Sequence, residues 1–203
     1  MRIVPATEFQ VATSEAGAIQ AQAQFFNDKY ANKQWYLDDS SLSALSIDIN
    51  AVWKDYSGAG VKVGVLDSQI DFRHPELQRA YSTALDYNFA SGTGAITIDP
   101  DNLPHYHGTF VAGVISAQAN NGVGTAGIAS GATLVGLGID YAADDTAAQI
   151  VRALNSAVNL DVVNNSWRFV SVFGDDFRRN PEYEDALEKL VSEGRGGLGT
   201  AIV

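Results

Sequence analysis

Short apolar runs alternate along this chain with stretches in which hydrophobic residues recur at helical spacing. The apolar runs are rich in Val, Ile and Leu and bounded by Gly or polar turn residues, which predicts buried strands. They cover residues 61–66, 132–139, 161–165 and 200–203, with a short additional strand expected near residues 85–89. Helical spacing predicts helices for residues 49–56, the run that starts at His107, residues 144–158 and residues 181–193.

Two of the predicted helices carry further signals. Asp145 and Thr146 are suited to cap the start of the helix over residues 144–158. In the helix over residues 181–193, Pro181 stands at the first position and Gly194 is the stop signal. The residues expected to face inward in this helix are Leu187, Leu190 and Val191.

Strands that alternate with helices predict the α/β class, with a parallel β-sheet flanked by helices on both faces. Functional groups in such sheets gather at the carboxyl ends of the strands. Asp67 and Ser166 follow predicted strands, and His107 opens a helix on the same side. We therefore expect these side chains at one edge of the sheet.

Composition limits the class of protein. The chain has 203 residues, 46% of them hydrophobic, which is enough for one core, and residues 1–26 read as a leader or flexible arm before a domain over residues 27–203. A net charge of −11 argues against nucleic acid and anionic membranes as partners. No cysteine is present, which excludes disulfides and thiolate zinc sites. No apolar run approaches the ~18 residues of a membrane span.

Asp67 and His107 are the candidate catalytic residues. A carboxylate that accepts a hydrogen bond from one imidazole nitrogen fixes the tautomer, and the other nitrogen can then take a proton from a nucleophile. No nucleophile is evident in the sequence pattern. Spacing alone also fits an ordinary loop or capping Asp and an ordinary helix-start His.

Four segments of the chain, in this order, resemble subtilisin-like serine proteases. They are VKVGVLDSQIDFRHPEL, HGTFVAGVISAQANNGVGTAGIA, NNSW and GRGGLGTAIV. Four shorter features resemble the kexin and furin branch in particular. They are QWYL, the Ser166-Trp167 pair, GRGGLG and the extra residue in SAQANNGVG. The resemblance covers roughly residues 28–203.

This resemblance implies a serine endopeptidase in which Asp67 and His107 belong to an Asp-His-Ser triad, with His107 as general base. It implies that Ser166, Trp167 and Arg168 bind the peptide or protein substrate. The nucleophilic Ser and the oxyanion Asn of the family would lie beyond Val203. The chain would then be the amino-terminal part of a catalytic domain, inactive alone, with an incomplete sheet and the rest of the domain as its partner.

The resemblance also implies a calcium site around the loop at residues 120–124. Two Asn and two Gly in five residues demand turn conformations there and offer carbonyl oxygens to a cation. The implied ligands are the side chains of Asp28, Glu76 and Asn121 and the carbonyls of Gln118, Val123 and Thr125. An unoccupied Asn-Gly turn is the alternative interpretation.

Four features depart from the family pattern, and one of them is that Val170 and Ser171 stand where the furin branch has an acidic residue. Gln69 and Arg168 stand where the family usually has Gly, and Ser68 replaces a carboxylate typical of the furin branch, so cleavage after paired basic residues is not implied. These departures leave open a degenerate, non-catalytic peptide-binding relative. The acidic balance leaves open a calcium-stabilised structural module of a larger exported protein. An extracellular or cell-surface location in a bacterium is expected.

Overall fold

The computed structural model describes residues 3–5, 26–37, 46–47, 49–94, 106–169 and 180–203. A five-stranded sheet lies at its centre, in the strand order β3-β4-β2-β5-β7, and all four neighbouring pairs are parallel. The strands are β2 (Lys62–Asp67), β3 (Tyr87–Asn88), β4 (Thr133–Gly138), β5 (Val162–Asn164) and β7 (Ala201–Ile202). Each of these lies within or beside the range that the apolar pattern predicts.

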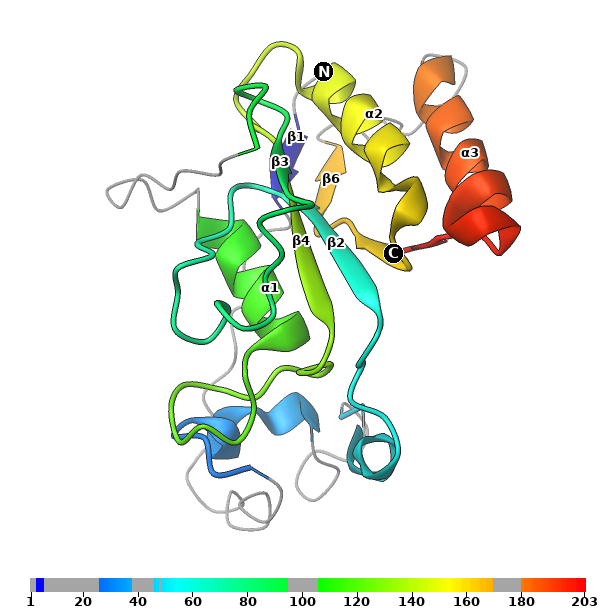
Figure 1. Ribbon diagram of the computed structural model, residues 1–203. Coiled ribbons are helices and arrows are strands. Elements are labelled where there is room, and N and C mark those ends of the chain that lie inside the picture. Colours follow the sequence, from blue (N-terminus) through cyan, green and yellow to red (C-terminus); the bar gives the residue numbers. More distant parts are fainter. Residues whose placement is uncertain (1–2, 6–25, 38–45, 48, 95–105, 170–179) are drawn as a thin grey trace.

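Helices cover both faces of this sheet (Figure 1), which confirms the predicted fold class. α1 (His107–Ser116) lies on one face, and α2 (Thr146–Ser156) and α3 (Pro181–Gly197) lie on the other. Short 3-10 helices cover Ala31–Lys33, Trp35–Leu37, Ile49–Lys54 and Ala157–Asn159. The helix predicted over residues 49–56 is therefore 3-10 rather than α. No helix within the described ranges has the length and apolarity to cross a membrane.

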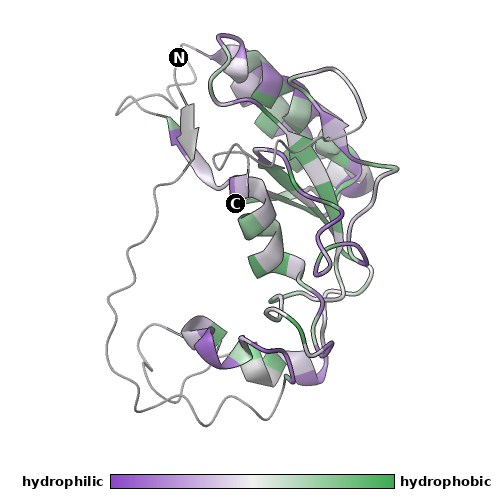
Figure 2. Cartoon of the chain, turned by 90° about the vertical axis from the view of Figure 1, so that its left-hand side faces the viewer, coloured by the Kyte–Doolittle hydropathy of each residue, from purple (hydrophilic) through white to green (hydrophobic). Residues whose placement is uncertain are grey.

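The core has two parts, one on each face of the sheet. Beside α1, Val63, Val65 and Leu134 pack with Ala112. On the other face the buried residues include Leu66, Val135, Leu137, Ile150, Leu154 and Leu190. Burial on both faces explains why the central strands are almost continuously apolar, as the hydropathy colouring of Figure 2 shows.

The carboxyl-terminal part of α3 differs from the prediction. Val191 is 64% exposed, whereas Ala186 and Leu190 are buried, so the inward stripe does not extend to Val191. The backbone of Gly194 is not helical (φ −53°, ψ 144°), and the regular helix ends there as predicted. Helical spacing alone left Val191 ambiguous because it stands next to a buried residue on the helix circumference.

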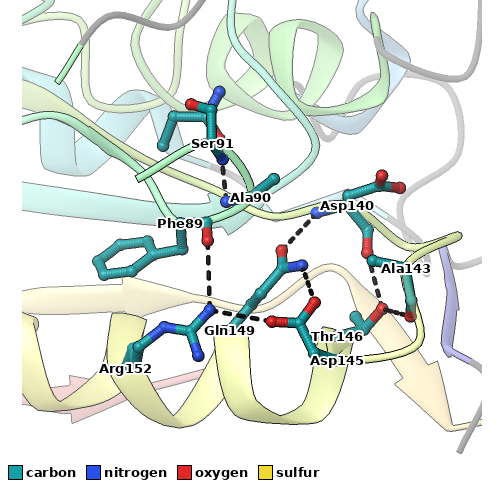
Figure 3. A network of polar contacts seen from close by, with 10 residues as sticks. Phe89, Ala90, Ser91, Asp140, Ala143, Asp145, Thr146, Gln149 and Arg152 are labelled. Carbon is teal, nitrogen blue, oxygen red and sulfur yellow. Dashed lines mark hydrogen bonds and ion pairs between the residues drawn. The ribbon is translucent and has the colours of Figure 1, made fainter. Parts of the chain in front are cut away.

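The loop from β4 to α2 is fastened by the polar network of Figure 3. Gln149 Oε1 accepts a hydrogen bond from Asp140 N (2.9 Å), and Gln149 Nε2 donates one to Asp145 Oδ1 (2.7 Å). Thr146 Oγ1 donates to the Asp140 carbonyl (2.7 Å), and Arg152 bonds Asp145 Oδ2 (3.2 Å). Asp145 occupies the N-cap position without a side-chain capping hydrogen bond. The predicted cap is thus replaced by bonds that fix the loop itself.

A separate two-stranded sheet joins the amino terminus to the segment after β5. β1 (Ile3–Pro5) pairs antiparallel with β6 (Trp167–Phe169). The sequence pattern of residues 1–26 gave no sign of this strand, and residues 6–25 lie outside the described part of the chain. The predicted leader therefore contains at least one ordered contact with the domain.

Candidate active site

Asp67 is the last residue of β2, and its side chain is fully buried. The preceding residues Val65 and Leu66 are also fully buried, so the strand end is held rigidly in the core. The Asp67 carboxylate accepts a hydrogen bond from the Ser68 backbone N–H at 2.6 Å. A buried carboxylate with fixed partners is a strong and well-oriented hydrogen-bond acceptor.

His107 supplies the second group, from the first residue of α1. Its Nδ1 lies 2.8 Å from Asp67 Oδ1 and 3.0 Å from Asp67 Oδ2. The imidazole is 25% exposed, while the carboxylate is inaccessible to solvent. Residues 40 positions apart in the sequence are therefore brought into direct contact, with Nε2 left outside that contact.

The two residues after His107 dock the start of α1 onto the end of β2. Gly108 N donates to Ser68 Oγ at 2.9 Å, and a Cβ on Gly108 would lie 2.4 Å from the Ser68 carbonyl oxygen. Thr109 Oγ1 accepts a hydrogen bond from Asp71 N at 2.8 Å. Only glycine fits the close approach, and the threonine hydroxyl fixes the other side of the turn. His-Gly-Thr thus holds the imidazole against Asp67.

The electrostatics of the pair favour the imidazolium. The hydrogen bond to Asp67 raises the pKa of His107, with a further contribution from the carboxylate charge, and these outweigh the opposing effect of burial. A general base becomes an imidazolium when it takes a proton, so the same carboxylate would stabilise that state.

Tyr141 is a further residue near Asp67 that the sequence did not single out. Burial, and then the negative charge of Asp67, raise the pKa of Tyr141 well above its usual range. Its hydroxyl is buried close to the Asp67 carboxylate. It follows β4, the strand next to β2, where Ile139 N donates to the Asp67 carbonyl at 2.8 Å. Its place at the carboxyl end of a neighbouring strand was the available signal.

The predicted substrate-binding residues lie beside the strand that carries Asp67. Ser166 Oγ accepts a hydrogen bond from Asn164 Nδ2 at 2.9 Å, and Trp167 Nε1 donates to the Leu66 carbonyl at 3.0 Å. Arg168 is exposed. The indole thus ties β6 to β2 one residue before Asp67, and the three residues remain predicted ligands of a peptide.

Three distant parts of the chain meet at the predicted calcium loop. Asp28 is buried, and its two carboxylate oxygens accept hydrogen bonds from Asn120 N (2.8 Å) and Asn121 N (3.0 Å). Asn121 Nδ2 donates to Glu76 Oε1 at 2.9 Å, and Asn121 Oδ1 accepts from Val123 N at 2.8 Å. The arm, the turn after β2 and the loop after α1 are therefore joined through the residues that the resemblance implied.

Some oxygens at this loop have no hydrogen-bond partner among the described residues. Glu76 is 5% exposed, and its Oε2 has no hydrogen-bond partner in the described part of the chain. A Cβ on Gly124 would lie 2.5 Å from that oxygen, so the loop packs directly against the carboxylate. Hydrogen bonds between described residues leave the carbonyls of Gln118, Val123 and Thr125 unused. The described ranges hold no cluster of three or more His, Cys, Asp or Glu side chains for a metal, so a site here would need amide and carbonyl oxygens in addition to the two carboxylates.

The sequence model described as the subtilase family matches residues 58–203, which is most of the chain. The chain belongs to the subtilase family. The resemblance of the four segments is thereby confirmed, and the alternation of strands and helices in this chain is that of a partial subtilase fold.

Individual proteins are similar to this chain in sequence or in fold. Proprotein convertase subtilisin/kexin type 4 of Homo sapiens is 30% identical over 191 residues, covering 87% of this chain and 23% of that protein. Neuroendocrine convertase 2 of Bos taurus is 34% identical over 123 residues, covering 55% of this chain and 18% of that protein. A solved protease from Pseudoalteromonas arctica superposes with a TM-score of 0.68 at 21% identity, covering 88% of this chain and 58% of that one. The chain thus spans about a fifth of the length of these two curated relatives.

The departures from the subtilase pattern are accommodated locally. Asn120 and Arg195 are the non-glycine residues with positive φ in the described ranges, so Gln69 needs no left-handed backbone in place of the usual Gly. Gln69 Oε1 is nevertheless buried without a hydrogen-bond partner there. Ser68, in place of a carboxylate, accepts the hydrogen bond from Gly108 N that docks α1. Neither substitution disturbs the contact between Asp67 and His107.

Proposed function

We propose that this chain is the amino-terminal part of the catalytic domain of a subtilisin-like serine endopeptidase. The observation that carries the proposal is the contact of His107 Nδ1 with both carboxylate oxygens of Asp67. Asp67 orients the imidazole, and Nε2 takes the proton of a serine nucleophile that a further part of the same domain supplies. His107 then returns the proton to the leaving amine.

The proposed substrate is an extended peptide that lies along Ser166, Trp167 and Arg168. Support comes from the hydrogen bond of Trp167 Nε1 to the Leu66 carbonyl, because it keeps this segment beside the strand that ends at Asp67. An extended peptide binds such an edge through backbone hydrogen bonds. Arg168 is exposed and favours acidic over basic side chains nearby.

The test is hydrolysis of an unstructured protein by the complete catalytic domain. His107→Ala should lower turnover on the order of a million-fold while peptide binding survives, because the imidazole acts in the transition state. Asp67→Asn should lower it roughly ten-thousand-fold through the wrong tautomer. Near-normal turnover of Asp67→Asn would show that the proposed triad is wrong.

We also propose that the loop at residues 120–124 holds a calcium ion. Asp28, Glu76 and Asn121 would hold it with their side chains, and Gln118, Val123 and Thr125 with their carbonyls. The unpartnered Glu76 Oε2 supports this, since a buried carboxylate oxygen without a partner is costly and a hard cation removes that cost. The ion would supply structural stability and no chemical step.

The acidic, cysteine-free composition supports a location outside the cell or at its surface, which we propose for a bacterial source. There, millimolar calcium fills sites of the weaker extracellular type.

A further inference from the structure

A tyrosine lies beside the buried end of the strand that carries Asp67. Tyr141 follows β4, whose last residue, Gly138, is paired in register with Asp67. The next residue along the chain, Ile139, donates its N–H to the Asp67 carbonyl at 2.8 Å. The ring of Tyr141 packs against the core cluster that contains Leu66, the residue before Asp67. The Tyr141 side chain therefore approaches Asp67 from the neighbouring strand.

The hydroxyl of Tyr141 is buried close to the Asp67 carboxylate. A hydroxyl that has lost contact with water needs an acceptor, because its burial without a hydrogen bond is costly. Burial, and then the negative charge of Asp67, raise the pKa of Tyr141 well above its usual range, so the phenol keeps its proton. An ionised carboxylate can only accept. The two groups therefore have complementary roles.

The Asp67 carboxylate has room for another donor. Oδ1 receives the two shorter contacts, from Ser68 N at 2.6 Å and from His107 Nδ1 at 2.8 Å. Oδ2 receives the longer contact from His107 Nδ1, at 3.0 Å. The two oxygens of an ionised carboxylate accept at about four positions. A third donor is therefore compatible with the contact to His107.

We propose that Tyr141 donates a hydrogen bond from its hydroxyl to the Asp67 carboxylate and so acts as a positioning residue for Asp67 and His107. This inference rests on the proposed function, because it assigns a residue that supports the same site. Ser68 N and His107 Nδ1 both bond Oδ1 most closely, so a donor from β4 adds a restraint on the rotation of the carboxylate. The ring also keeps water away from the carboxylate, which strengthens the polar contacts there.

The bond from Tyr141 moderates the effect of Asp67 on His107. A donor shares the negative charge of the carboxylate and weakens its attraction for the imidazolium. Tyr141→Phe keeps the ring and removes the hydroxyl, so it should raise the pKa of His107 by about half a unit. A neutral hydrogen bond corresponds to roughly one pKa unit, and only part of its effect reaches the imidazole. Turnover should fall about fivefold with KM unchanged, because the orientation of the pair matters in the transition state.

The experiment measures the pKa of His107 in the complete catalytic domain, by NMR pH titration of the imidazole resonances, together with the pH profile of kcat/KM. Tyr87→Phe is the matched control, because the Tyr87 hydroxyl donates to the Gly92 carbonyl at 2.9 Å, on a loop beside β3. The control should keep the parent values of the His107 pKa and of turnover. Thermal melting checks that both variants are folded.

A double-mutant cycle tests whether Tyr141 acts through Asp67. The charged acceptor is absent in Asp67→Asn, so adding Tyr141→Phe to that variant should leave the pKa of His107 unchanged. A shift of equal size in both backgrounds would overturn the proposal, because Tyr141 would then affect His107 by another route.

An equal pKa of His107 in the parent and Tyr141→Phe would also overturn the proposal, and so would a lowered pKa, since the hydroxyl would then not share the carboxylate charge. The expected pKa shift with unchanged turnover would contradict the positioning role. The expected shift, lost in the Asp67→Asn background, in a domain that hydrolyses no peptide would support the hydrogen bond and contradict the proposed endopeptidase function instead.

Discussion

The Asp67 carboxylate is the most constrained group of the candidate site. It lies at the end of a strand buried on both sides, and it receives hydrogen bonds from Ser68 N and from His107 Nδ1. Burial of a carboxylate is tolerated because these donors replace water. The buried carboxylate in turn affects His107, because its hydrogen bond and charge raise the pKa of the imidazole against the effect of burial.

Asp67→Asn should lower the pKa of His107, because the variant removes both the charged acceptor and its Coulombic attraction. The imidazole resonances of His107 in an NMR pH titration report the change directly. Asp71→Asn is the control, because the Asp71 side chain pairs with Arg73 and not with His107. A His107 pKa that is equal in the parent and Asp67→Asn would show that the contact does not persist in solution.

The raised pKa of His107 also determines how the stability of the fold changes with pH. The folded pKa of His107 lies above its unfolded value of about 6.5, so its stabilising contribution is fully present below that value. It is lost as the pH rises through the folded pKa. Unfolding in denaturant should therefore show a smaller difference between the parent and Asp67→Asn at pH 9 than at pH 6. A difference that grows with pH would contradict this assignment.

At the scale of elements, the candidate site depends on how α1 meets β2. The close approach at Gly108 brings His107 to Asp67, and the hydrogen bond between Asp71 N and Thr109 Oγ1 fixes the turn between the two elements. The rest of α1 is less constrained. Its outer face exposes Phe110 and Val114.

Gly108→Ala should destabilise the chain by about 1–3 kcal/mol, since the new Cβ would overlap the Ser68 carbonyl oxygen. Gly113 is a matched control in the same helix, because a Cβ there meets no atom within 4 Å. Gly113→Ala should stabilise by about 0.5–1 kcal/mol through helix propensity. Chemical denaturation measures both. Equal effects of the two substitutions would argue against close packing at Gly108.

The loop at residues 120–124 joins three parts of the chain, so a calcium ion bound there should stabilise the whole fold. Calcium at about a hundred times its Kd should raise the free energy of unfolding by about 2.7 kcal/mol, because it binds only the folded state. Asp28→Ala and Glu76→Gln should remove this response, whereas exposed Glu182→Gln should keep it. Melting with calcium and with chelator measures it. An unchanged melt on chelation, with no ion found by elemental analysis, would exclude the site.

At the scale of the whole molecule, several large apolar side chains are exposed to solvent. Phe110, Leu198 and Val203 are 72%, 77% and 70% exposed. β7 is an edge of the main sheet and pairs only with β5 in the described part of the chain. Exposed apolar side chains and unpaired strand edges are features that other segments can cover. They agree with the proposal that further parts of a catalytic domain pack here.

The 203-residue chain alone should therefore bind a fluorescent dye that reports exposed apolar surface, and it should melt without a sharp transition. Dye fluorescence and calorimetry measure these properties. Phe110→Ser should reduce dye binding, and Tyr183→Phe, which removes only a hydroxyl, is its control. A sharp melt of a monomer without dye binding would show that the exposed residues do not form such a surface.

The same chain should leave an unstructured protein intact, because an Asp67–His107 pair without a nucleophile and oxyanion donors activates at most water. Electrophoresis after long incubation measures this. His107→Ala is the control that separates intrinsic activity from a contaminating protease. Cleavage by the parent that disappears in His107→Ala would show that the chain contains all the groups that catalysis needs.

The sequence by itself determined the alternation of strands and helices. It also determined that the candidate site lies at the carboxyl ends of the strands. Strand β2 and helix α1 are specified locally, by an apolar run that stops at Asp67 and by a helical stripe that starts at His107. Right-handed connection of parallel strands then places both residues at the same edge. Their position at one edge was therefore predictable from the pattern, whereas their pairing as catalytic residues was implied only by the family resemblance.

Only the tertiary structure decided features that depend on distant partners. β1 exists because β6, which lies far away in the sequence, offers an edge with which it pairs, Pro5 opposite Trp167. Three residues without periodicity carry no local signal of this pairing. Tyr141 lies near Asp67 because β4 is the neighbour of β2 in the sheet. The order of strands in the sheet cannot be derived from the local pattern. The local spacing of apolar residues specifies each helix and strand. Strand order and edge pairing depend instead on packing between segments that are far apart in the sequence.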